Sequence, residues 1–429
     1  MSAIVIIILC SIIVAIAIGY KTKINFGLLG IAFAFLFGCL LADMSPSKVL
    51  GLWPAKLFFQ MFTVTFFYAF AINNGTLELF ARKLVYMVRK SAFLLPIILW
   101  LVGFVLAGIG PGSVAMFLVL SPIIMQVAKE SEMHPVLAAI VIATGPNSGA
   151  WSPIAVNGIT TRGLIETAGY DTAQAAAYAN VVWRNMIIAS IIIFIIGYFV
   201  FRGFKLKPLN MDKPADYTGK QKTTIALIVI MAFLLIVPAL LKGVGVGGAI
   251  AWFADKMDVT YLAIVFSVIA MLLKIGDEKD AMAGVPWKTI IMVCGMGLLV
   301  AVASESGALA FLSDYISRGF NPAVIPIVMC IVAGVMSVFA STMGVVVPTL
   351  YPLVFAISAA TGSPAGLLFS VIPIAAGYSG MSPFSLCGGL VLAAADETKR
   401  ERLFVLLIIV AIVSILLTTG MVALGILGN

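Results

Sequence analysis

Charged residues are scarce in this sequence. Of its 429 residues only 10% are Asp, Glu, Lys or Arg, whereas 62% are hydrophobic. A soluble globular protein carries about 25% charged residues to cover its surface, so the composition excludes that class. Apolar runs recur at about the length that an α-helix needs to cross a bilayer. The runs are continuous rather than alternating, which predicts an all-α polytopic membrane protein surrounded by lipid and not a transmembrane barrel.

Cysteine pairs and histidine are also lacking. The five cysteines stand singly, and His134 is the one histidine. This argues against a disulfide framework and a thiolate metal site. The chain has no HExxH, GxSxG or GxxxxGK[ST] motif, so we expect no cofactor, no intramembrane enzyme and no ATP-driven pump. The net charge of +8 is the basic excess that membrane proteins carry in cytoplasmic loops, and we expect no nucleic-acid partner.

Two apolar segments differ from the rest because they are broken in the middle. The first, 91–128, is interrupted by "GIGPGSV" (108–114), and the second, 323–360, by "ASTMGVVVP" (340–348). Glycine and proline end one helix there and start another, so we predict two re-entrant hairpins whose tips stop inside the membrane. Ten full spans are expected besides, near 2–20, 24–42, 57–74, 136–159, 181–201, 223–241, 259–275, 287–304, 365–394 and 403–426.

The distribution of the basic residues tests this predicted membrane topology. If both hairpins return to the side from which they start, most of the 26 Lys and Arg residues fall on one face of the membrane. That face is then cytoplasmic, and both termini are expected outside. The segment 202–222 becomes a cytoplasmic linker between two halves.

The two halves repeat each other at an offset close to 230 residues. "HPVLAAIVIATGPNSGAWSPIAVNG" (134–158) aligns with "SPAGLLFSVIPIAAGYSGMSPFSLCGG" (363–389), and the two broken segments align as well. We predict repeats at 1–201 and 223–429, each with five spans and one hairpin. Because five is odd, the repeats have opposite orientations, which is typical of secondary transporters. Paired breaks at the midplane fit such a carrier better than a channel, whose filter is repeated around a symmetry axis.

Two spans contain polar stretches where lipid demands apolar residues. These are "ATGPNSGAWSPIAVNG" (143–158) in the span near 136–159, and "AAGYSGMSPFSLCGG" (375–389) in the span near 365–394. We predict that both spans unwind there, at 145–153 and 377–385. Unwound carbonyls can hold a cation, and the N–H groups of a half-helix can hold an anion. Unpaired in hydrocarbon, each such group would cost several kcal/mol.

The four interruptions therefore supply the candidate site. We expect substrate contacts from Gly112, Ser113, Asn147, Ser148, Ser152, Ser341, Thr342, Ser379, Ser382 and Ser385. We expect cation contacts, with sodium as the possible metal, from Gly110, Gly145, Asn147, Gly344, Gly377 and Ser379. The alternative interpretation is that these residues have a structural role, because small residues let helices approach closely and hydroxyls bond to their own helix. Trp151 and Tyr378 are candidates for the wall of a cavity, Asn157 for a helix cap, and His134 for a loop residue rather than a proton relay.

Ionisable residues are nearly absent from the spans. A proton-coupled carrier usually needs an intramembrane Asp, Glu or His, whereas a sodium site needs only oxygen atoms. The sequence therefore favours sodium over protons as the coupled ion. Without an arginine, hydroxyls and helix N-termini would hold the anion, and the cation would supply counter-charge.

The paired hairpins and paired broken helices resemble the ion transporter superfamily. Within it the chain resembles dicarboxylate carriers of the malonate-uptake (MatC) type and, more distantly, the divalent-anion:sodium symporters. Those symporters carry Ser-Asn-Thr at each hairpin tip; here the second tip keeps Ser341-Thr342, and the first reads Gly-Pro-Gly-Ser at 110–113.

This resemblance implies a homodimer in the bacterial cytoplasmic membrane. It also implies a carrier that moves a small carboxylate, most simply a dicarboxylate, together with a cation by an elevator-like motion. The alternative is a proton-coupled carrier of another anion, such as a monocarboxylate, a hydroxy acid or sulfate.

Overall fold

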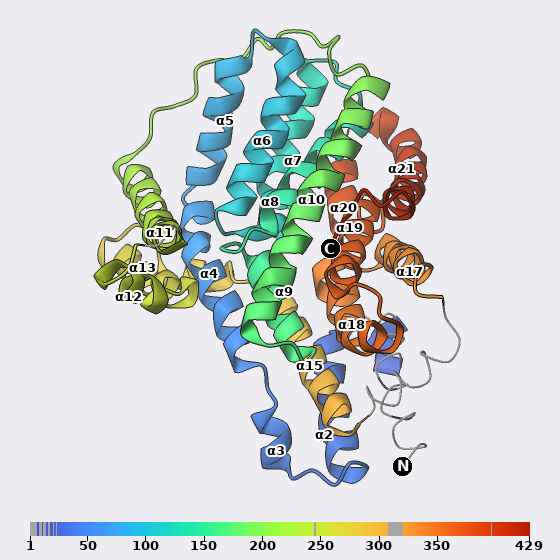
Figure 1. Ribbon diagram of the computed structural model, residues 1–429. Coiled ribbons are helices and arrows are strands. Elements are labelled where there is room, and N and C mark those ends of the chain that lie inside the picture. The colour runs from blue at the N-terminus through green and yellow to red at the C-terminus, as the bar shows by residue number, and fades with distance from the viewer. Residues whose placement is uncertain are drawn as a thin grey trace.

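A computed structural model describes residues 24–243, 246–307, 321–395 and 397–429, together with scattered residues before Ile24. Every regular element in these ranges is helical, as Figure 1 shows. Seven helices of the described residues are long and apolar enough to cross a membrane, and shorter apolar helices accompany them. The all-α polytopic fold class is thus confirmed. The predicted span near 2–20 falls largely outside the described residues.

The first half, blue to green in Figure 1, contains a short 3-10 turn, η1, among its helices. Its elements are α2 Phe26–Leu40, α3 Pro46–Gly51, α4 Ala55–Asn73, α5 Thr76–Val88, η1 Ala92–Leu94, α6 Leu95–Gly108, α7 Gly112–Glu130, α8 Pro135–Ala150, α9 Val156–Thr167 and α10 Thr172–Val200.

The second half contains a five-residue π-helical turn, η2. Its elements are α11 Gly219–Gly243, α12 Ala249–Lys256, α13 Val259–Leu272, α14 Glu278–Ala283, α15 Trp287–Glu305, α17 Ile325–Phe339, η2 Thr342–Val346, α18 Val347–Thr361, α19 Ala365–Ser379, α20 Leu386–Ala393 and α21 Glu397–Ala423.

Local geometry recurs between the halves. Helices α4 and α15 have 19 residues each and follow Pro54 and Pro286, whose φ and ψ angles are −75° and 65° and −78° and 63°. After the two broken helices, a Cβ on Gly158 would overlap the Ser152 carbonyl oxygen, and one on Gly388 would overlap that of Ser382. Equivalent positions therefore make equivalent turns, which supports the predicted repeat. The opposite orientation of the halves stays a prediction.

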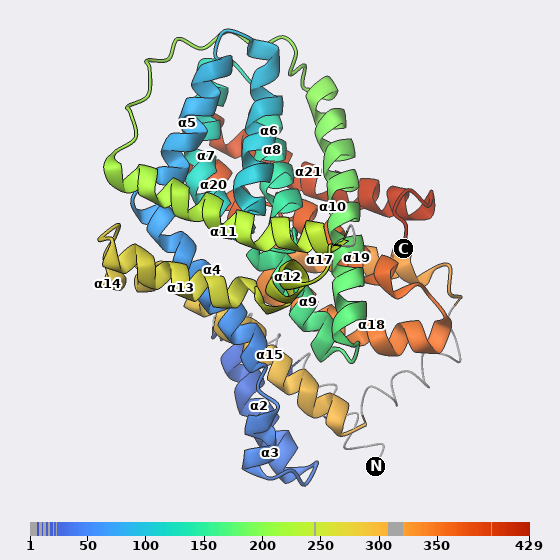
Figure 2. The ribbon, with the colours of Figure 1, turned by 60° about the vertical axis from the view of Figure 1, so that its left-hand side comes forward.

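Four helices pair across the halves. Helix α2 packs on α15, and α4 packs on α13, as Figures 1 and 2 show. Small residues allow the α2–α15 contact: a Cβ on Gly30 would lie 2.7 Å from the Gly295 carbonyl oxygen, and one on Gly27 would overlap Ile291. Backbones that approach this closely are typical of helix pairs in membranes. These four helices join the two halves into one frame.

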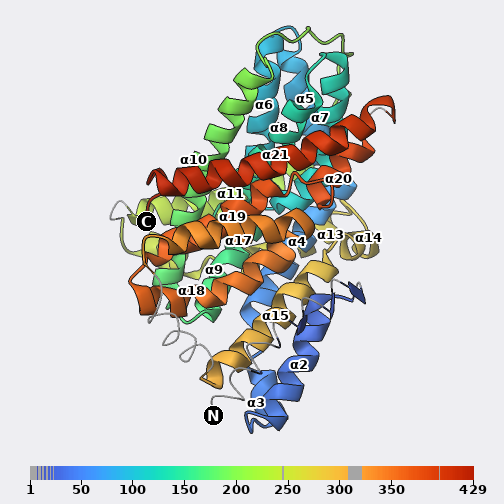
Figure 3. The same cartoon turned by 90° about the vertical axis from the view of Figure 1, so that its right-hand side faces the viewer.

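The hairpins, by contrast, pack mainly within their own half, although α7 also contacts α20 and α18 also contacts α9. Helix α6 lies along α8, and α17 lies along α19, as Figure 3 shows for the second pair. The α6–α8 contact again depends on glycine, since a Cβ on Gly145 would lie 2.5 Å from the Trp100 carbonyl oxygen and one on Gly149 would overlap Phe104. Each hairpin and its neighbouring broken helix therefore form one packed unit.

All four predicted interruptions exist, although each is shorter than expected. The chain breaks at 109–111, 151–155, 340–341 and 380–385. Residues 145–150 and 377–379, which we expected to be unwound, are the last turns of α8 and α19. The Ser148 hydroxyl bonds to the carbonyl oxygens of Thr144 and Gly145 in its own helix, at 2.9 Å each. Close packing on α6 and such bonds override the weak helix propensity of glycine and serine.

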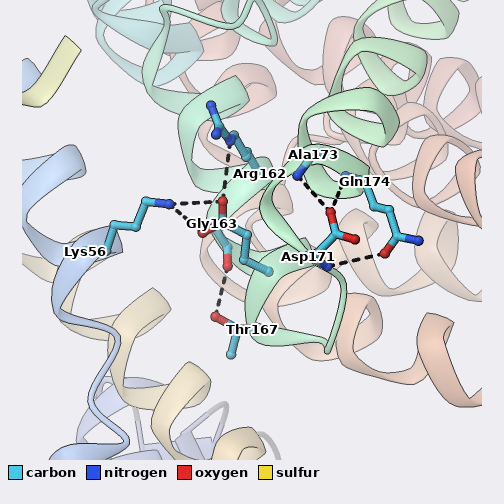
Figure 4. Close-up of polar contacts among 8 residues, drawn as sticks. Lys56, Arg162, Gly163, Thr167, Asp171, Ala173 and Gln174 are labelled. Carbon is cyan, nitrogen blue, oxygen red and sulfur yellow. Dashed lines mark hydrogen bonds and ion pairs between the residues drawn. The ribbon is translucent and has the colours of Figure 1, made fainter. Parts of the chain in front are cut away.

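Helix α10 begins about nine residues before the predicted start of its span. A capping box causes this: Asp171 Oδ1 accepts hydrogen bonds from the backbone N–H groups of Ala173 and Gln174, and the Gln174 side chain returns to the Asp171 N–H (Figure 4). Such a box satisfies the first free N–H groups of a helix. Helices α3, α5, α12 and α14 lie in segments for which we predicted no span.

Candidate functional site

A small cavity of about 50 Å³ lies where both hairpin tips meet both broken helices. Six of the predicted site residues line it: Ser113, Asn147, Ser341, Thr342, Gly377 and Ser385. The remaining lining residues are Val114, Phe117, Ser337, Ala340, Met343, Gly380, Leu386 and Cys387. We call this the polar cavity. It draws on α7 and α8 of the first half and on α17, η2, α19 and α20 of the second, so neither half forms it alone.

Asn147 joins the two broken helices at the cavity. It is 5% exposed, and its Nδ2 donates a hydrogen bond of 3.1 Å to the carbonyl oxygen of Gly377 on α19. The two residues are 230 positions apart, which is close to the offset of the predicted repeat. The bond therefore joins the broken helix of one half to that of the other. An amide offers donors and an acceptor, so Asn147 retains capacity for a ligand.

The second hairpin tip, residues 340–344, is held by hydroxyl groups. Ser341 Oγ accepts a hydrogen bond of 3.2 Å from the Gly344 N–H, and Thr342 Oγ1 donates one of 3.0 Å to the Ala376 carbonyl oxygen on α19. Ser337 Oγ lies 3.1 Å from Thr342 Oγ1. We did not predict Ser337; its position one helical turn before Ser341 is the signal that could have identified it.

The first hairpin tip, residues 109–113, is held by backbone geometry instead. Gly112 has a φ angle of +79°, which side chains other than glycine rarely adopt. No side chain caps the N-terminus of α7, so N–H groups of its first turn remain available next to the cavity. Ser113 Oγ accepts a hydrogen bond of 3.0 Å from Asn157 Nδ2. Asn157 thus braces the tip rather than its own helix end, which we had expected it to cap.

Several predicted residues lie outside the polar cavity and have partners of their own. Ser379 Oγ donates to the Gly334 carbonyl oxygen at 2.9 Å, which ties α19 to α17. Ser152 Oγ bonds to the Gly108 carbonyl oxygen, and Ser382 Oγ accepts from the Phe384 N–H at 3.3 Å. The structure does not bring these groups to the cavity: Gly110, Gly112, Gly145, Ser148, Ser152, Gly344, Ser379 and Ser382.

The predicted cation ligands are only partly assembled. Of the six, Asn147 and Gly377 line the polar cavity, and they already bond to each other. Among the residues that the structure describes, no group of three or more His, Cys, Asp or Glu side chains could hold a metal ion. The oxygens at hand are neutral carbonyl, amide and hydroxyl oxygens, which suit a hard cation such as sodium.

The described lining of the polar cavity carries no charged side chain. An anion there would meet hydroxyl groups, the Asn147 amide and the free N–H groups at the start of α7. A helix N-terminus carries about half a positive elementary charge, which favours anions. The electrostatics of the cavity therefore admit one small anion but do not neutralise it.

Trp151 and Tyr378 do not line the polar cavity. Both are buried, and the Tyr378 hydroxyl donates a hydrogen bond of 2.9 Å to the Met186 carbonyl oxygen on α10. The expected wall is formed instead by Phe117 and Leu386. Aromatic residues of this chain are thus used for packing between helices.

His134 caps helix α8 at its start. Its Nδ1 accepts a hydrogen bond of 3.2 Å from the Val136 N–H, and its ring stacks on Phe201. Burial, and secondarily the positive charge of Arg402, lower the pKa of His134 below its usual value of 6.5. The imidazole is therefore neutral at pH 7, as an acceptor must be.

Comparison with known proteins adds independent information. Residues 1–150 match the family described as "Dicarboxylate carrier protein MatC N-terminus", and residues 249–428 match the family "Citrate transporter". The chain resembles carboxylate carriers of the ion transporter superfamily. The predicted resemblance is thereby confirmed. None of the curated proteins matches the sequence.

The fold has a relative among solved structures. The Alcanivorax borkumensis YdaH transporter, described as having an unusual topology, superposes with a TM-score of 0.60 at 11% sequence identity. The match covers 89% of this chain and 86% of that one, and it shows a shared fold. Together, the two families indicate a multi-pass membrane transporter of the dicarboxylate or citrate type, so the prediction that the chain is not an enzyme is confirmed.

Proposed function

We propose that the chain is a secondary active transporter of a small dicarboxylate in the bacterial cytoplasmic membrane, with both termini outside. The observation that carries this proposal is the polar cavity, which residues of both hairpins and both broken helices form jointly. Midplane sites between repeats are typical of carriers that alternate access. The matched families supply the substrate class.

The anion is held by dipoles and hydroxyl groups. One carboxylate accepts hydrogen bonds from N–H groups in the first turn of α7 and from the Ser113 hydroxyl. The other meets the Ser341 hydroxyl and the Asn147 amide, which also line the cavity, and the cavity of about 50 Å³ widens to take the whole dicarboxylate. Hydrogen bonds to an ionised acceptor are stronger than those between neutral groups, which compensates for the lack of an arginine.

The coupled cation is sodium. The described cavity lining offers oxygen ligands but no Asp, Glu or His that could carry a proton. A cation bound near Asn147 and Gly377 would offset the charge of the anion, so each ligand raises the affinity for the other. A proton-coupled carrier of a monocarboxylate, hydroxy acid or sulfate is the alternative that the experiment below separates.

An elevator-like motion follows from the packing. We define the scaffold as α2, α4, α13 and α15, which pair across the halves, and the transport part as the hairpins and broken helices. The two parts touch where Lys56 Nζ of α4 lies 2.8 Å from Glu166 Oε2 of α9. Figure 4 shows Lys56 reaching toward α9. Hydrated ion pairs of this kind contribute at most about 1 kcal/mol, so the contact can open and re-form. As the resemblance to the ion transporter superfamily implies, we expect two chains to assemble as a homodimer.

Uptake into proteoliposomes tests this proposal. A dicarboxylate should enter only with an inward sodium gradient, and a pH gradient alone should not drive it. Asn147→Ala should raise the KM for the dicarboxylate about tenfold, because a hydrogen bond to a charged ligand contributes roughly 1.5–3 kcal/mol.

The matched control is Asn185→Ala. Asn185 is a buried amide whose Nδ2 bonds to Ser370 Oγ at 3.0 Å and to the Gly428 carbonyl oxygen at 2.7 Å, away from the polar cavity. The Asn185→Ala variant should have a lower thermal stability and an unchanged KM for the dicarboxylate. Uptake driven by a pH gradient without sodium, or equal KM values in both variants, would contradict the assigned site or ion.

A further inference from the structure

A second cavity, of about 250 Å³, lies between the scaffold and the transport part. Met61, Thr65 and Tyr68 of α4 form one wall. Ala115 of α7 and Val156 of α9 are among the residues that form the other. Helix α4 packs on α9, and Figures 1 and 2 show the two helices side by side. We call this the apolar cavity.

The hydrogen-bonding side chains that face the apolar cavity are mostly saturated. Thr65 Oγ1 donates to the Met61 carbonyl oxygen at 2.8 Å, and Thr160 Oγ1 donates to that of Val156 at 2.7 Å. The Tyr68 hydroxyl bonds to the Ile109 carbonyl oxygen. Because the wall offers a carboxylate few free donors, the cavity suits neither the proposed substrate nor water. Apolar cavities of about 150 Å³ stay dry and admit benzene, so this one has room for two fused rings.

The apolar cavity is separate from the polar one. Val114 and Met343 line both cavities, and Asn157, which lines the apolar cavity, donates a hydrogen bond to Ser113, which lines the polar one. An occupant of the apolar cavity therefore touches the back of both hairpin tips without entering the anion site. It also touches the scaffold, through Tyr68 and Met61.

We propose that the apolar cavity binds an uncharged hydrophobic molecule about the size of a bicyclic aromatic, and that this ligand blocks transport. The blocking effect rests on the proposed elevator function. The cavity wall belongs to two bodies that must slide past each other, so the cavity exists only in the arrangement seen here. A ligand that binds one of two conformations shifts the population toward it.

Naphthalene is a suitable probe, measured by titration into the purified full-length chain without carboxylate. Binding should be saturable, and at ten times its dissociation constant naphthalene should lower dicarboxylate uptake about tenfold. Ala115→Phe places a ring in the cavity and should weaken naphthalene binding at least tenfold. Ala177→Phe makes the same change at an exposed position of α10 and should bind the probe as the wild type does.

Three results would overturn the proposal. The first is equal binding in Ala115→Phe and Ala177→Phe, the second is full uptake at saturating naphthalene, and the third is displacement of the probe by dicarboxylate. The binding measurement needs no transport. A chain that takes up no carboxylate would therefore contradict the proposed function, while the two variants would still decide whether the cavity binds the probe.

Discussion

The two hairpin tips occupy equivalent places and are built from different chemistry. At the first tip, glycines set the backbone, and the N-terminus of α7 has no side-chain cap. At the second tip, Ser341 caps the turn, and Thr342 bonds to α19. The second tip uses its side chains to hold its own backbone, whereas the first keeps backbone donors available. We therefore expect the first tip to grip the anion mainly by its backbone and the second to be held in place by side chains.

The largest effect is expected from Gly110→Ala at the first tip. A Cβ at this position would overlap the Tyr68 ring. The tip must therefore move, and its N–H groups no longer point toward the anion. Uptake should fall below detection, with a clear loss of thermal stability. The measurement is proteoliposome uptake beside a melting curve.

The control for that variant is Gly362→Ala. Gly362 has a φ angle of +70° and no neighbouring atom within 4 Å of an added Cβ. An alanine at this position carries backbone strain of about 1–2 kcal/mol but causes no clash, so uptake by the variant should persist. If Gly110→Ala transports as well as Gly362→Ala does, the first tip does not depend on its backbone.

A smaller effect is expected from Thr342→Val at the second tip. The change keeps the shape and removes the hydrogen bond to the Ala376 carbonyl oxygen. A lost buried hydrogen bond costs about 1–3 kcal/mol, so uptake should drop roughly tenfold. The matched control is Thr349→Val, because the buried Thr349 hydroxyl has no hydrogen-bond partner, and its loss should be neutral. Equal uptake by the two variants would show that the second tip is not held by its side chains.

The smallest effect concerns the starts of the two broken helices. Helix α8 is capped by His134, whereas α19 follows Pro364, which cannot cap it with a side chain. Because burial and Arg402 lower the pKa of His134, the unfolded chain binds this proton more readily than the folded one. The stability contribution is therefore complete above pH 6.5, the usual pKa, and is lost as the pH falls below it.

His134→Asn tests this difference between the halves. Asparagine also caps helices well but does not titrate there. The variant should melt at the wild-type temperature at pH 8 and should lose less stability than the wild type between pH 7 and pH 5. Its uptake should depend on pH as the wild type's does, since His134 has no place in the polar cavity. An altered pH profile of uptake would instead indicate a proton relay.

The sequence predicted what depends on local chemistry. Glycine and proline at 108–114 and 340–348 located the hairpin tips, because these residues end helices in any context. Asn147 and Gly377 were both predicted as cation ligands, one in each broken span, and they bond to each other. The ends of the breaks at 145–150 and 377–379 were predicted wrongly, because close packing keeps them helical.

Tertiary partners were the part that could not be predicted. The spacing of Ser337 from Ser341 places it near the second tip, but the sequence does not show that Ser337 contacts Thr342 while Ser379 bonds to Gly334. Both are small hydroxyl residues in apolar helices. Only the packing of α17 on α19 decides which hydroxyl faces the cavity and which is used between helices.

The bond between Asn147 and Gly377 has one further consequence. If the two halves exchange conformations during the transport cycle, each residue takes the place of the equivalent residue in the other half. Asn147 and Gly377 would then remain neighbours. Contacts elsewhere would be replaced by the equivalent contacts of the other half, while the amide of Asn147 would keep the same neighbour throughout. Because both residues belong to the transport part, we expect this bond to stay intact while that part moves along the scaffold.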